Sequence, residues 1–447
     1  MTHARVPVVS SALPPGPRMP ATVQTALWIR RAQWMLGQCQ RRFGDTFTLR
    51  IAGEGTWVVI SHPRDVETIF KADPEIARAG EGNRILEPVL GPDSVLLLDG
   101  RAHLRQRKLM LPAFHGARMA GYRELIAGIA RAEIDRWPPG EPQRLRPRMQ
   151  ALTLEVILRA VLGVGDGVRR EQLRVALRRL LAMGTDRRWG PVFVALGPER
   201  VARFGPFRRG REPVDRLLYA EIAERRAALA TDTEPGERAD IMSLLLAARY
   251  EDGTPMRDSE LRDELITLLV AGHETTANAL AWAGERLARH PEMLARLGEE
   301  ARAGTSTEYV AAVVQETLRL RPVISIVQRV LAAPLTVAGY ELPAGTAVVP
   351  ALYLVNRRAD TYPDPECFDP ERFLGRPPGT YTWIPFGGGV RRCLGAAFAQ
   401  FEMETVLHEL AARARIAPVR AADEPVLRRA VTETPRHDAE VLVESLP

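Results

Sequence analysis

The chain has 447 residues, of which 46% are hydrophobic and 26% are charged. These values are ordinary for a globular protein with a large core, and they exclude a disordered or low-complexity chain. The formal net charge of +6 is a small excess for this length, and the basic residues are spread along the chain, so no binding to nucleic acid is predicted.

The cysteine content and the hydropathy pattern indicate the compartment. Three cysteines are too few and too scattered for a disulfide framework, which favours a reducing, cytoplasmic setting. The N-terminus has no signal-peptide pattern, and no stretch approaches the roughly 20 apolar residues of a membrane span. We therefore expect a soluble cytoplasmic protein with no membrane span.

The predicted elements begin with an extended, proline-rich lead-in over residues 1–20. An amphipathic helix is expected over Ala21–Phe43. Thr46–Ile51 alternates with period two and Trp57–Ile60 returns after a glycine turn, which predicts a β-hairpin. From Asp65 to about Gly304 the helical period dominates.

Strand-rich patterns return over residues 325–350 and again from 414 to the end, which with residues 45–61 make the β-rich parts. Because helices far outweigh strands, we expect one mainly α domain over residues 1–447 with a small β-rich region, and not a series of βαβ units.

One predicted helix is unusually long. It begins at Asp258-Ser259 and continues to His290, and roughly thirty residues exceed the usual 8–20, so it should cross the whole molecule. Its middle, residues 271–276, reads Ala-Gly-His-Glu-Thr-Thr. Threonine hydroxyls that bond back to the carbonyl four residues earlier bend a helix, and a bend here would open a groove beside an acid and an alcohol.

A glycine-rich loop delivers Cys393 to the start of the last helical pattern. The helix N-terminus, Arg391 and Arg392 are expected to lower the pKa of the thiol. One thiolate cannot build a closed zinc site, but it can supply an axial ligand to haem iron. The plainer alternative is a buried cysteine in a glycine-rich turn.

The pattern formed by Phe386, Gly389, Arg391, Cys393 and Gly395 resembles the haem-ligand loop of the cytochrome P-450 family at every defined position. The resemblance implies the cytochrome P-450 fold, with one long central helix crossing over the haem. It implies heme b (iron protoporphyrin IX) as cofactor, Cys393 as the metal ligand, and cofactor contacts from the other four residues.

Residues 271–275 resemble a second pattern of the family, Ala/Gly-Gly-x-Asp/Glu-Thr. The resemblance implies that Thr275 contacts dioxygen and that Glu274 relays protons from solvent. Splitting the O–O bond consumes protons in a site kept dry, so a positioned acid is needed there. The alternative is a helix with a solvated glutamate, and His273 is assigned no role.

Four basic residues are expected to meet the two haem propionates by resemblance: His103, Arg107, Arg329 and Arg391. His103 and Arg107 lie four apart and share a helix face. The alternative for any one of them is a solvated basic surface.

Glu316, Arg319 and Arg372 resemble the buried triad of the family, which is structural and supports the segment that carries the cysteine. For the substrate pocket, the resemblance nominates Ala271, Val323, Ile324 and Ile326 together with residues 85–97, with Ile326 nearest the haem. These side chains are largely aliphatic. The arginine-rich segment 187–211 corresponds to a lid. Its positive charge suits a substrate carboxylate, and the alternative is a loop whose arginines are solvated.

We therefore interpret the chain as a bacterial haem-thiolate monooxygenase that inserts one oxygen atom from O2 into a C–H or C=C bond. The expected substrate is lipophilic: a fatty acid, terpenoid, steroid or polyketide-like molecule. The chain resembles the branch of the family that oxidises fatty acids, terpenes and steroids. No flavin or iron–sulfur motif follows Cys393. Electrons are thus expected from a ferredoxin-type or flavodoxin-type partner with its NAD(P)H-dependent reductase, docking near Cys393 where Arg392 and the Arg105–Lys108 cluster offer positive charge.

Two alternatives remain. One is a peroxygenase driven by hydrogen peroxide, and the other is a haem-binding protein without turnover. The acid–alcohol pair at Glu274 and Thr275 argues against both, because neither alternative needs it.

Overall fold

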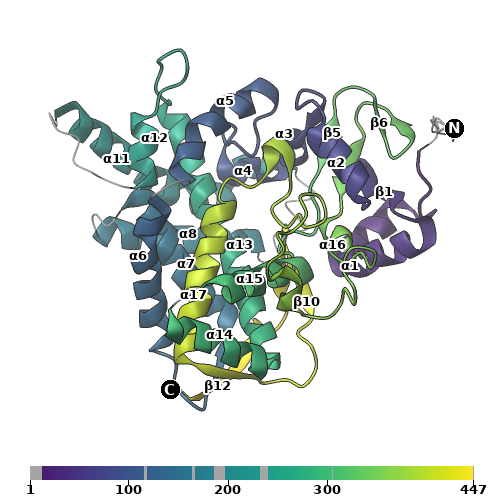
Figure 1. The fold of residues 1–447 in the computed structure, drawn as a ribbon. Helices are drawn as coiled ribbons and strands as arrows, with labels where there is room; N and C mark the ends of the chain where they lie inside the picture. Colours follow the sequence, from purple (N-terminus) through teal and green to yellow (C-terminus); the bar gives the residue numbers. More distant parts are fainter. Residues whose placement is uncertain are drawn as a thin grey trace.

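The computed structural model describes residues 13–114, 118–163, 167–185, 197–231, 240–304 and 306–445. Helices dominate, as the sequence predicts, and they fill one side of the molecule, whereas most strands gather with the first helix on the other side (Figure 1). Of the predicted lid, residues 187–196 lie outside the described residues.

The helices of the described chain are α1 Ala21–Phe43, α2 Pro63–Lys71, α3 Ala79–Gly82, α4 Glu87–Leu90, α5 Gly100–Met110, α6 Arg118–Ile134, α7 Leu145–Leu162, α8 Gly167–Thr185, α10 Pro198–Arg203, α11 Gly205–Thr231, α12 Ile241–Ala247, α13 Asp258–Arg289, α14 Pro291–Ala303, α15 Glu308–Leu320, α16 Leu352–Val355 and α17 Ala396–Arg413. The strands are β1 Thr46–Ile51, β2 Gly55–Ile60, β3 Ala77–Arg78, β4 Pro142–Arg144, β5 Arg329–Leu331, β6 Leu335–Val337, β7 Tyr340–Leu342, β8 Ala347–Pro350, β9 Arg415–Pro418, β10 Val426–Arg429, β11 Thr432–Pro435 and β12 Glu440–Ser445.

The largest sheet has the strand order β1-β2-β8-β5-β3. Its first two strands form the predicted antiparallel hairpin, and β8 then joins β2 in parallel, with Trp57 opposite Ala347. The N-terminal hairpin is thereby tied to the strand-rich region some 290 residues later, in which β5 carries Arg329. The sheet thus positions one of the four predicted propionate ligands.

Two short strands correct the sequence-based assignment. β3 and β4 lie between Asp65 and Gly304, where the sequence predicts helices interrupted by breaks and no strand. Each is only two or three residues long, and each pairs with a distant strand, β3 with β5 and β4 with β12. Their conformation is therefore selected by the partner strand and leaves no period of its own in the sequence.

The predicted long helix is α13, which has 32 residues and is buried along most of its length. Its cap is one residue earlier than expected: Arg257 is the N-cap, and its backbone N–H donates to the Glu260 carboxylate at 2.7 Å. Because α13 packs against α7, α11, α15 and α17, it forms the centre of the helical core.

The predicted triad residues meet in the interior. Glu316 and Arg319 of α15 are both fully buried and form a two-point ion pair, at 2.5 and 2.7 Å. Arg372 reaches the same carboxylate at 3.3 Å. The remaining donors of Arg319 bond to the carbonyls of Asn356, Pro365 and Cys367 at 2.7–3.0 Å, so α15 fixes the irregular segment that precedes the cysteine loop.

Glu316→Gln should destabilise the protein by about 3–5 kcal/mol, because it leaves the fully buried guanidinium of Arg319 without a carboxylate partner. The midpoint of denaturant unfolding measures this. Glu371→Gln is the matched control, since Glu371 pairs with Arg296 at the exposed surface, where an ion pair is worth about 0–1 kcal/mol. Equal midpoints for the two variants would contradict the assigned importance of the buried carboxylate.

Candidate active site

The loop that carries Cys393 is fixed by its backbone. The Cys393 N–H donates to the Phe386 carbonyl at 2.9 Å, and the Gly395 N–H donates to the cysteine sulfur. Gly389 has φ +64, and a Cβ there would lie 2.0 Å from the Phe70 carbonyl oxygen. Only glycine permits this approach, so the loop can pack closely on α2.

The environment of the thiol differs from the sequence-based expectation. The Cys393 side chain is solvent-accessible, yet burial raises its pKa, against the lowering effects of the Gly395 amide, Arg107 and Arg392. Both observations fit a sulfur that is surrounded by protein, where desolvation acts, and that a ligand can still reach. The predicted fall in the thiol pKa is wrong because desolvation outweighs the nearby charges.

The four predicted propionate ligands lie in one cluster, which we call the cationic cluster (His103, Arg107, Arg329 and Arg391). The His103 ring is only 2% exposed, and its Nδ1 atom has no hydrogen-bond partner among the described residues. Burial lowers the pKa of His103 to about 3, with further lowering by Arg391, Arg107 and Arg329. The imidazole is therefore neutral, and three guanidinium groups lie within electrostatic reach of it.

The cationic cluster is under-compensated. Arg391 binds Asp99 at 2.6 Å and the Val95 carbonyl at 3.1 Å. Within the described chain, neither Arg107 nor Arg329 forms an ion pair; Arg329 lies over the Phe70 ring, 5.5 Å from its centroid. Three cations thus face one carboxylate, and two uncompensated positive charges remain. That excess matches the two propionates of a haem, so the residues present fit the group, and Cys393 is the residue that would hold its iron.

The middle of α13 presents two different faces. One packs on α7, where a Cβ at Gly272 would lie 3.0 Å from Ile157 and where the His273 carbonyl accepts from Thr153 at 3.0 Å. The other face carries Ala271, which is exposed, and Thr275, which is half-buried. The Thr275 hydroxyl donates to the Ala271 carbonyl at 2.7 Å, yet the helix continues without interruption to Arg289.

Glu274 is turned away from Thr275. Its carboxylate accepts from Arg146 at 3.1 Å and from Gln150 at 2.7 Å, both on α7. Burial alone would raise its pKa, but His273, Arg146 and the hydrogen bond from Gln150 together outweigh burial, so the pKa lies below its usual range. The structure therefore does not bring the predicted acid and alcohol into contact.

The predicted pocket residues do not form one continuous wall. Ala271 is exposed and Ile324 is half-buried, but Val323 is buried in the main core. Ile326 packs against the cluster around Trp28 and Trp57. Residues 85–97 range from Ile85, 53% exposed, to a buried Val95.

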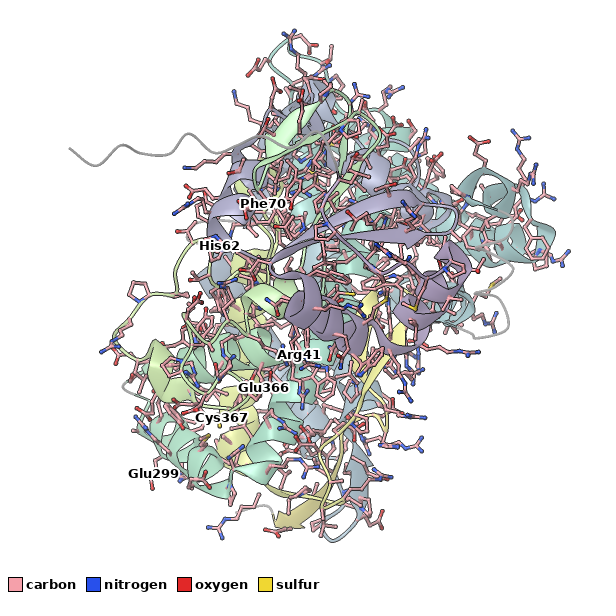
Figure 2. All side chains as sticks on the ribbon, turned by 90° about the vertical axis from the view of Figure 1, so that its right-hand side faces the viewer. Arg41, His62, Phe70, Glu299, Glu366 and Cys367 are labelled. Carbon is pink, nitrogen blue, oxygen red and sulfur yellow. The ribbon has the colours of Figure 1, made fainter. Side chains whose placement is uncertain are left out.

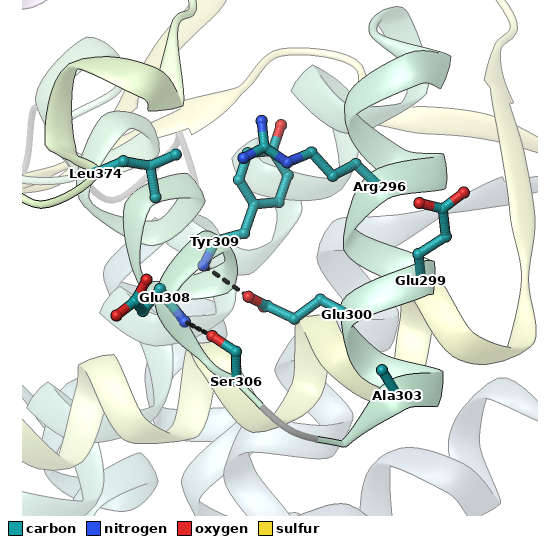
Figure 3. Close-up of a pocket in the computed structure, with 8 residues that line it drawn as sticks. All are labelled: Arg296, Glu299, Glu300, Ala303, Ser306, Glu308, Tyr309 and Leu374. Atoms are coloured by element: carbon teal, nitrogen blue, oxygen red, sulfur yellow. Dashed lines mark hydrogen bonds between the residues drawn. The ribbon is translucent and has the colours of Figure 1, made fainter.

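A surface pocket of about 400 Å³ lies elsewhere, between α14 and α15 (Figure 3). Charged residues dominate its lining, which consists of Arg296, Glu299, Glu300, Ala303, Ser306, Glu308, Tyr309 and Leu374. None of the predicted site residues belongs to it, so it supports no role in cofactor binding.

Sequence reasoning missed three partners of the site. Asp99 holds Arg391 and also accepts from the Gly80 N–H at 2.7 Å. Arg146 holds Glu274. Glu264 of α13 accepts from the Val95 N–H at 2.7 Å and from Gln106 at 3.1 Å. Their partners lie from 19 to 292 residues away in the chain, so no local pattern could have revealed them.

The fold, the accessible thiol and the under-compensated cationic cluster together are the features expected of a haem-binding protein. A family model described as cytochrome P450 matches residues 14–436. The chain is 45% identical to cytochrome P450 135B1 of Mycobacterium tuberculosis over 97% of its own length and 92% of the relative's. It is 39% identical to cytochrome P450 135A1 of the same organism, over 96% and 95% of the two chains.

This chain therefore belongs to the cytochrome P450 family, a family of monooxygenases, and family membership implies a haem cofactor. Among solved structures, the retinoic acid-bound cyanobacterial CYP120A1 has a TM-score of 0.83 at 25% identity, covering 98% of this chain and 100% of that one. The cytochrome P450DA heme domain has a TM-score of 0.82 at 22% identity, covering 97% and 98%. None of the described helices is long and apolar enough to cross a membrane.

Arg329→Met should weaken haem retention by about ten- to a hundredfold, because a hydrogen bond from a buried charged group is worth about 1.5–3 kcal/mol. Haem transfer to an excess of an apo-haem acceptor protein measures it. Arg50→Gln, on an exposed position of β1, is the control and should leave the transfer rate unchanged. An unchanged rate in Arg329→Met would rule out a direct contact with the haem.

Glu264 should make stability depend on pH. Burial raises its pKa to about 8, although Gln106 and the Val95 N–H oppose this. Between about pH 4.5 and about pH 8, the folded protein keeps a proton that the unfolded chain releases, so stability falls as pH rises, by up to about 1.4 kcal/mol per pH unit. In Glu264→Gln this component of the slope should vanish. Denaturant titrations of both proteins across this window measure it, and parallel pH profiles would contradict it.

Proposed function

We propose that this P450 inserts one oxygen atom from O2 into a C–H or C=C bond of a lipophilic substrate. The observation that carries the proposal is the accessible Cys393 sulfur beside the cationic cluster, with its two uncompensated positive charges. A haem held there by the Cys393 thiolate supplies the activation of O2. The remaining work falls to residues of α13.

Thr275 and Glu274 are the proposed residues for handling oxygen and protons. Thr275 lies on the face of α13 that does not pack on α7, and its hydroxyl has a carbonyl acceptor, so its oxygen can still accept a hydrogen bond. Glu274 is held by Arg146 and Gln150, and Arg146 in turn reaches Asp438, which is only partly buried. To deliver a proton, the Glu274 side chain has to leave α7 and turn toward Thr275.

A lipophilic substrate is supported by the half-buried side chain of Ile324 and the exposed side chain of Ile85. CYP120A1, at 25% identity, carries retinoic acid in its solved structure, which is an apolar isoprenoid chain with a carboxylate. The proposed classes are accordingly fatty acids, terpenoids, steroids and polyketide-like molecules.

Electrons are proposed to come from a ferredoxin-type or flavodoxin-type protein in the cytoplasm. Two of the predicted docking cations are already paired at the surface, Arg105 with Asp252 at 2.8 Å and Lys108 with Glu251 at 2.5 Å. Exposed Arg392, next to the thiolate, has no ion pair among the described residues. Positive charge for an acidic partner is therefore expected mainly around Arg392.

The test uses the haem-loaded protein. Carbon monoxide added to the reduced form should give the thiolate-type absorption spectrum, and an imidazole-type spectrum would overturn the assignment of Cys393. Lipophilic compounds are then screened for turnover with ferredoxin, reductase and NAD(P)H, and in parallel with hydrogen peroxide alone. Turnover with peroxide only would favour the peroxygenase, and no turnover with either would favour a non-catalytic haem protein.

Thr275→Ala should lower the ratio of product to NAD(P)H consumed by about tenfold or more, since positioned proton transfer contributes about 10²–10⁴-fold. Haem content should not change. Thr276→Ala is the matched control: Thr276 is a buried neighbour whose hydroxyl also donates to a carbonyl four residues earlier, that of Gly272. If both variants couple electrons to product as well as the parent protein, Thr275 does not have the assigned role.

A further inference from the structure

The N-terminal part of the chain exposes an unusual number of large apolar side chains. Val23, Ile29 and Trp34 of α1 are 44%, 55% and 50% exposed, and Leu13 and Met19 of the preceding segment are also exposed. Single exposed apolar residues are normal at a protein surface. Five within 22 residues of chain form a group that the rest of the described surface does not repeat.

These side chains are not the inner face of α1. The inner face holds Trp28, Met35, Leu36 and Cys39, which are buried against the β1–β2 hairpin. The rings of Trp28 and Trp57 meet edge to face with centroids 5.2 Å apart. Ile29 and Trp34 are exposed on either side of Arg31, where α1 has a kink with non-helical backbone angles, φ -147 and ψ 47.

The lead-in is held beside the helix. The Thr48 hydroxyl donates to the Pro14 carbonyl at 2.7 Å, and the Thr48 N–H donates to the Pro15 carbonyl at 2.9 Å. Gln24 of α1 donates to the Met19 carbonyl at 2.8 Å and accepts from the Arg50 N–H at 2.9 Å. Leu13 and Met19 therefore belong to the same ordered surface as α1.

The charge along this stretch of the chain has one sign. Residues 13–44 contain five arginines and no aspartate or glutamate. Among the described residues none of the five forms an ion pair, and the first acidic residue, Asp45, is already paired with Arg358 at 2.8 Å. Figure 2 turns α1 toward the viewer, with Arg41 labelled near its end. The five are Arg18, Arg30, Arg31, Arg41 and Arg42.

We propose that this surface, the α1 face (Leu13, Met19, Val23, Ile29 and Trp34 with the five arginines), docks the protein on the surface of an anionic lipid bilayer. Apolar side chains bordered by unpaired cations are the pattern of helices that lie in a membrane interface, and tryptophan favours that depth. The arginines pair with lipid phosphates. Since no described helix can span a bilayer, the contact is peripheral and reversible.

A bilayer fits this surface better than the other partners that its charge allows. Nucleic acid would use the arginines but would leave Ile29 and Trp34 exposed. A second copy of the chain would bring two sets of five arginines face to face, which repel. A bilayer with negative headgroups and an apolar interior satisfies both kinds of side chain.

The test is flotation of the haem-loaded protein with lipid vesicles. Vesicles of phosphatidylcholine mixed with phosphatidylglycerol should carry the protein upward, added salt should weaken this, and phosphatidylcholine alone should carry much less. The double variants Ile29→Gln/Trp34→Gln and Arg30→Gln/Arg31→Gln should each bind at least about tenfold more weakly. Bromine attached to the lipid chains should quench the protein's fluorescence, and Trp34→Phe should remove most of that quenching.

Matched controls lie on other elements. Arg208→Gln/Arg209→Gln replaces two exposed neighbouring arginines of α11, and Val419→Gln replaces an exposed apolar residue after β9. Both should bind vesicles like the parent protein, and an unchanged haem spectrum in every variant verifies folding. Failure to float with anionic vesicles overturns the proposal, and so does equal loss of binding in the controls and the α1 variants. A dimer that Ile29→Gln/Trp34→Gln dissociates, without vesicle binding by the parent protein, also overturns it. None of these readouts requires turnover.

Discussion

The buried carboxylate of Glu316 is the constraint on which the placement of the cysteine depends. A fully buried guanidinium costs more to desolvate than a single ion pair returns, unless all of its donors are used. In Arg319 they are used: two bond to Glu316 and the others bond to three backbone carbonyls between Asn356 and Cys367. The irregular stretch that precedes the cysteine loop has little regular secondary structure to hold it. It is ordered because its carbonyl groups satisfy a charge that would otherwise be unpaired.

A second electrostatic arrangement has the opposite character. Around His103, positive charge exceeds negative charge. Burial disfavours the charged form of these arginines and lowers the pKa of Arg329 and of Arg391 to about 10. The triad is complete by itself, whereas the cationic cluster is completed by an anionic ligand. The two groups thus differ in whether their charges are balanced within the protein, although the triad and the cationic cluster both contain arginines that are wholly or partly buried.

The sequence predicted the fold class, the hairpin, the length of α13 and the groups of residues that meet at the triad and at the cationic cluster. The fold class, the hairpin and α13 follow from local hydrophobic periodicity. The triad and the cationic cluster follow from the resemblance of their residues to patterns of one family. It could not predict β3 and β4, whose partners are distant strands, or Asp99 and Arg146, whose partners lie 292 and 128 residues away. It also grouped Glu274 with Thr275 through their resemblance to a family pattern, whereas the structure turns the Glu274 carboxylate toward Arg146 and Gln150 of α7. In a helix, successive residues point about 100° apart, so adjacent positions face different surroundings.

The segment from Gly91 to Asp99 shows how the two sides of the site are joined. Three side chains of α13 bind this segment. Asp263 accepts from the Asp93 N–H at 2.9 Å, and Glu264 accepts from the Val95 N–H at 2.7 Å. The hydroxyls of Thr267 and Ser94 share a hydrogen bond of 2.8 Å. A Cβ at Gly91 would lie 2.2 Å from the Asp263 carboxylate, so the chain passes directly over the helix. The carbonyl of Val95 accepts from Arg391, two residues before Cys393. Val95 is thus carried by a segment that is anchored both to α13 and to the cysteine loop. Because Arg391 belongs to the cationic cluster and also binds Asp99 at the end of this segment, the position of the segment and the pairing of charge in the cluster are linked.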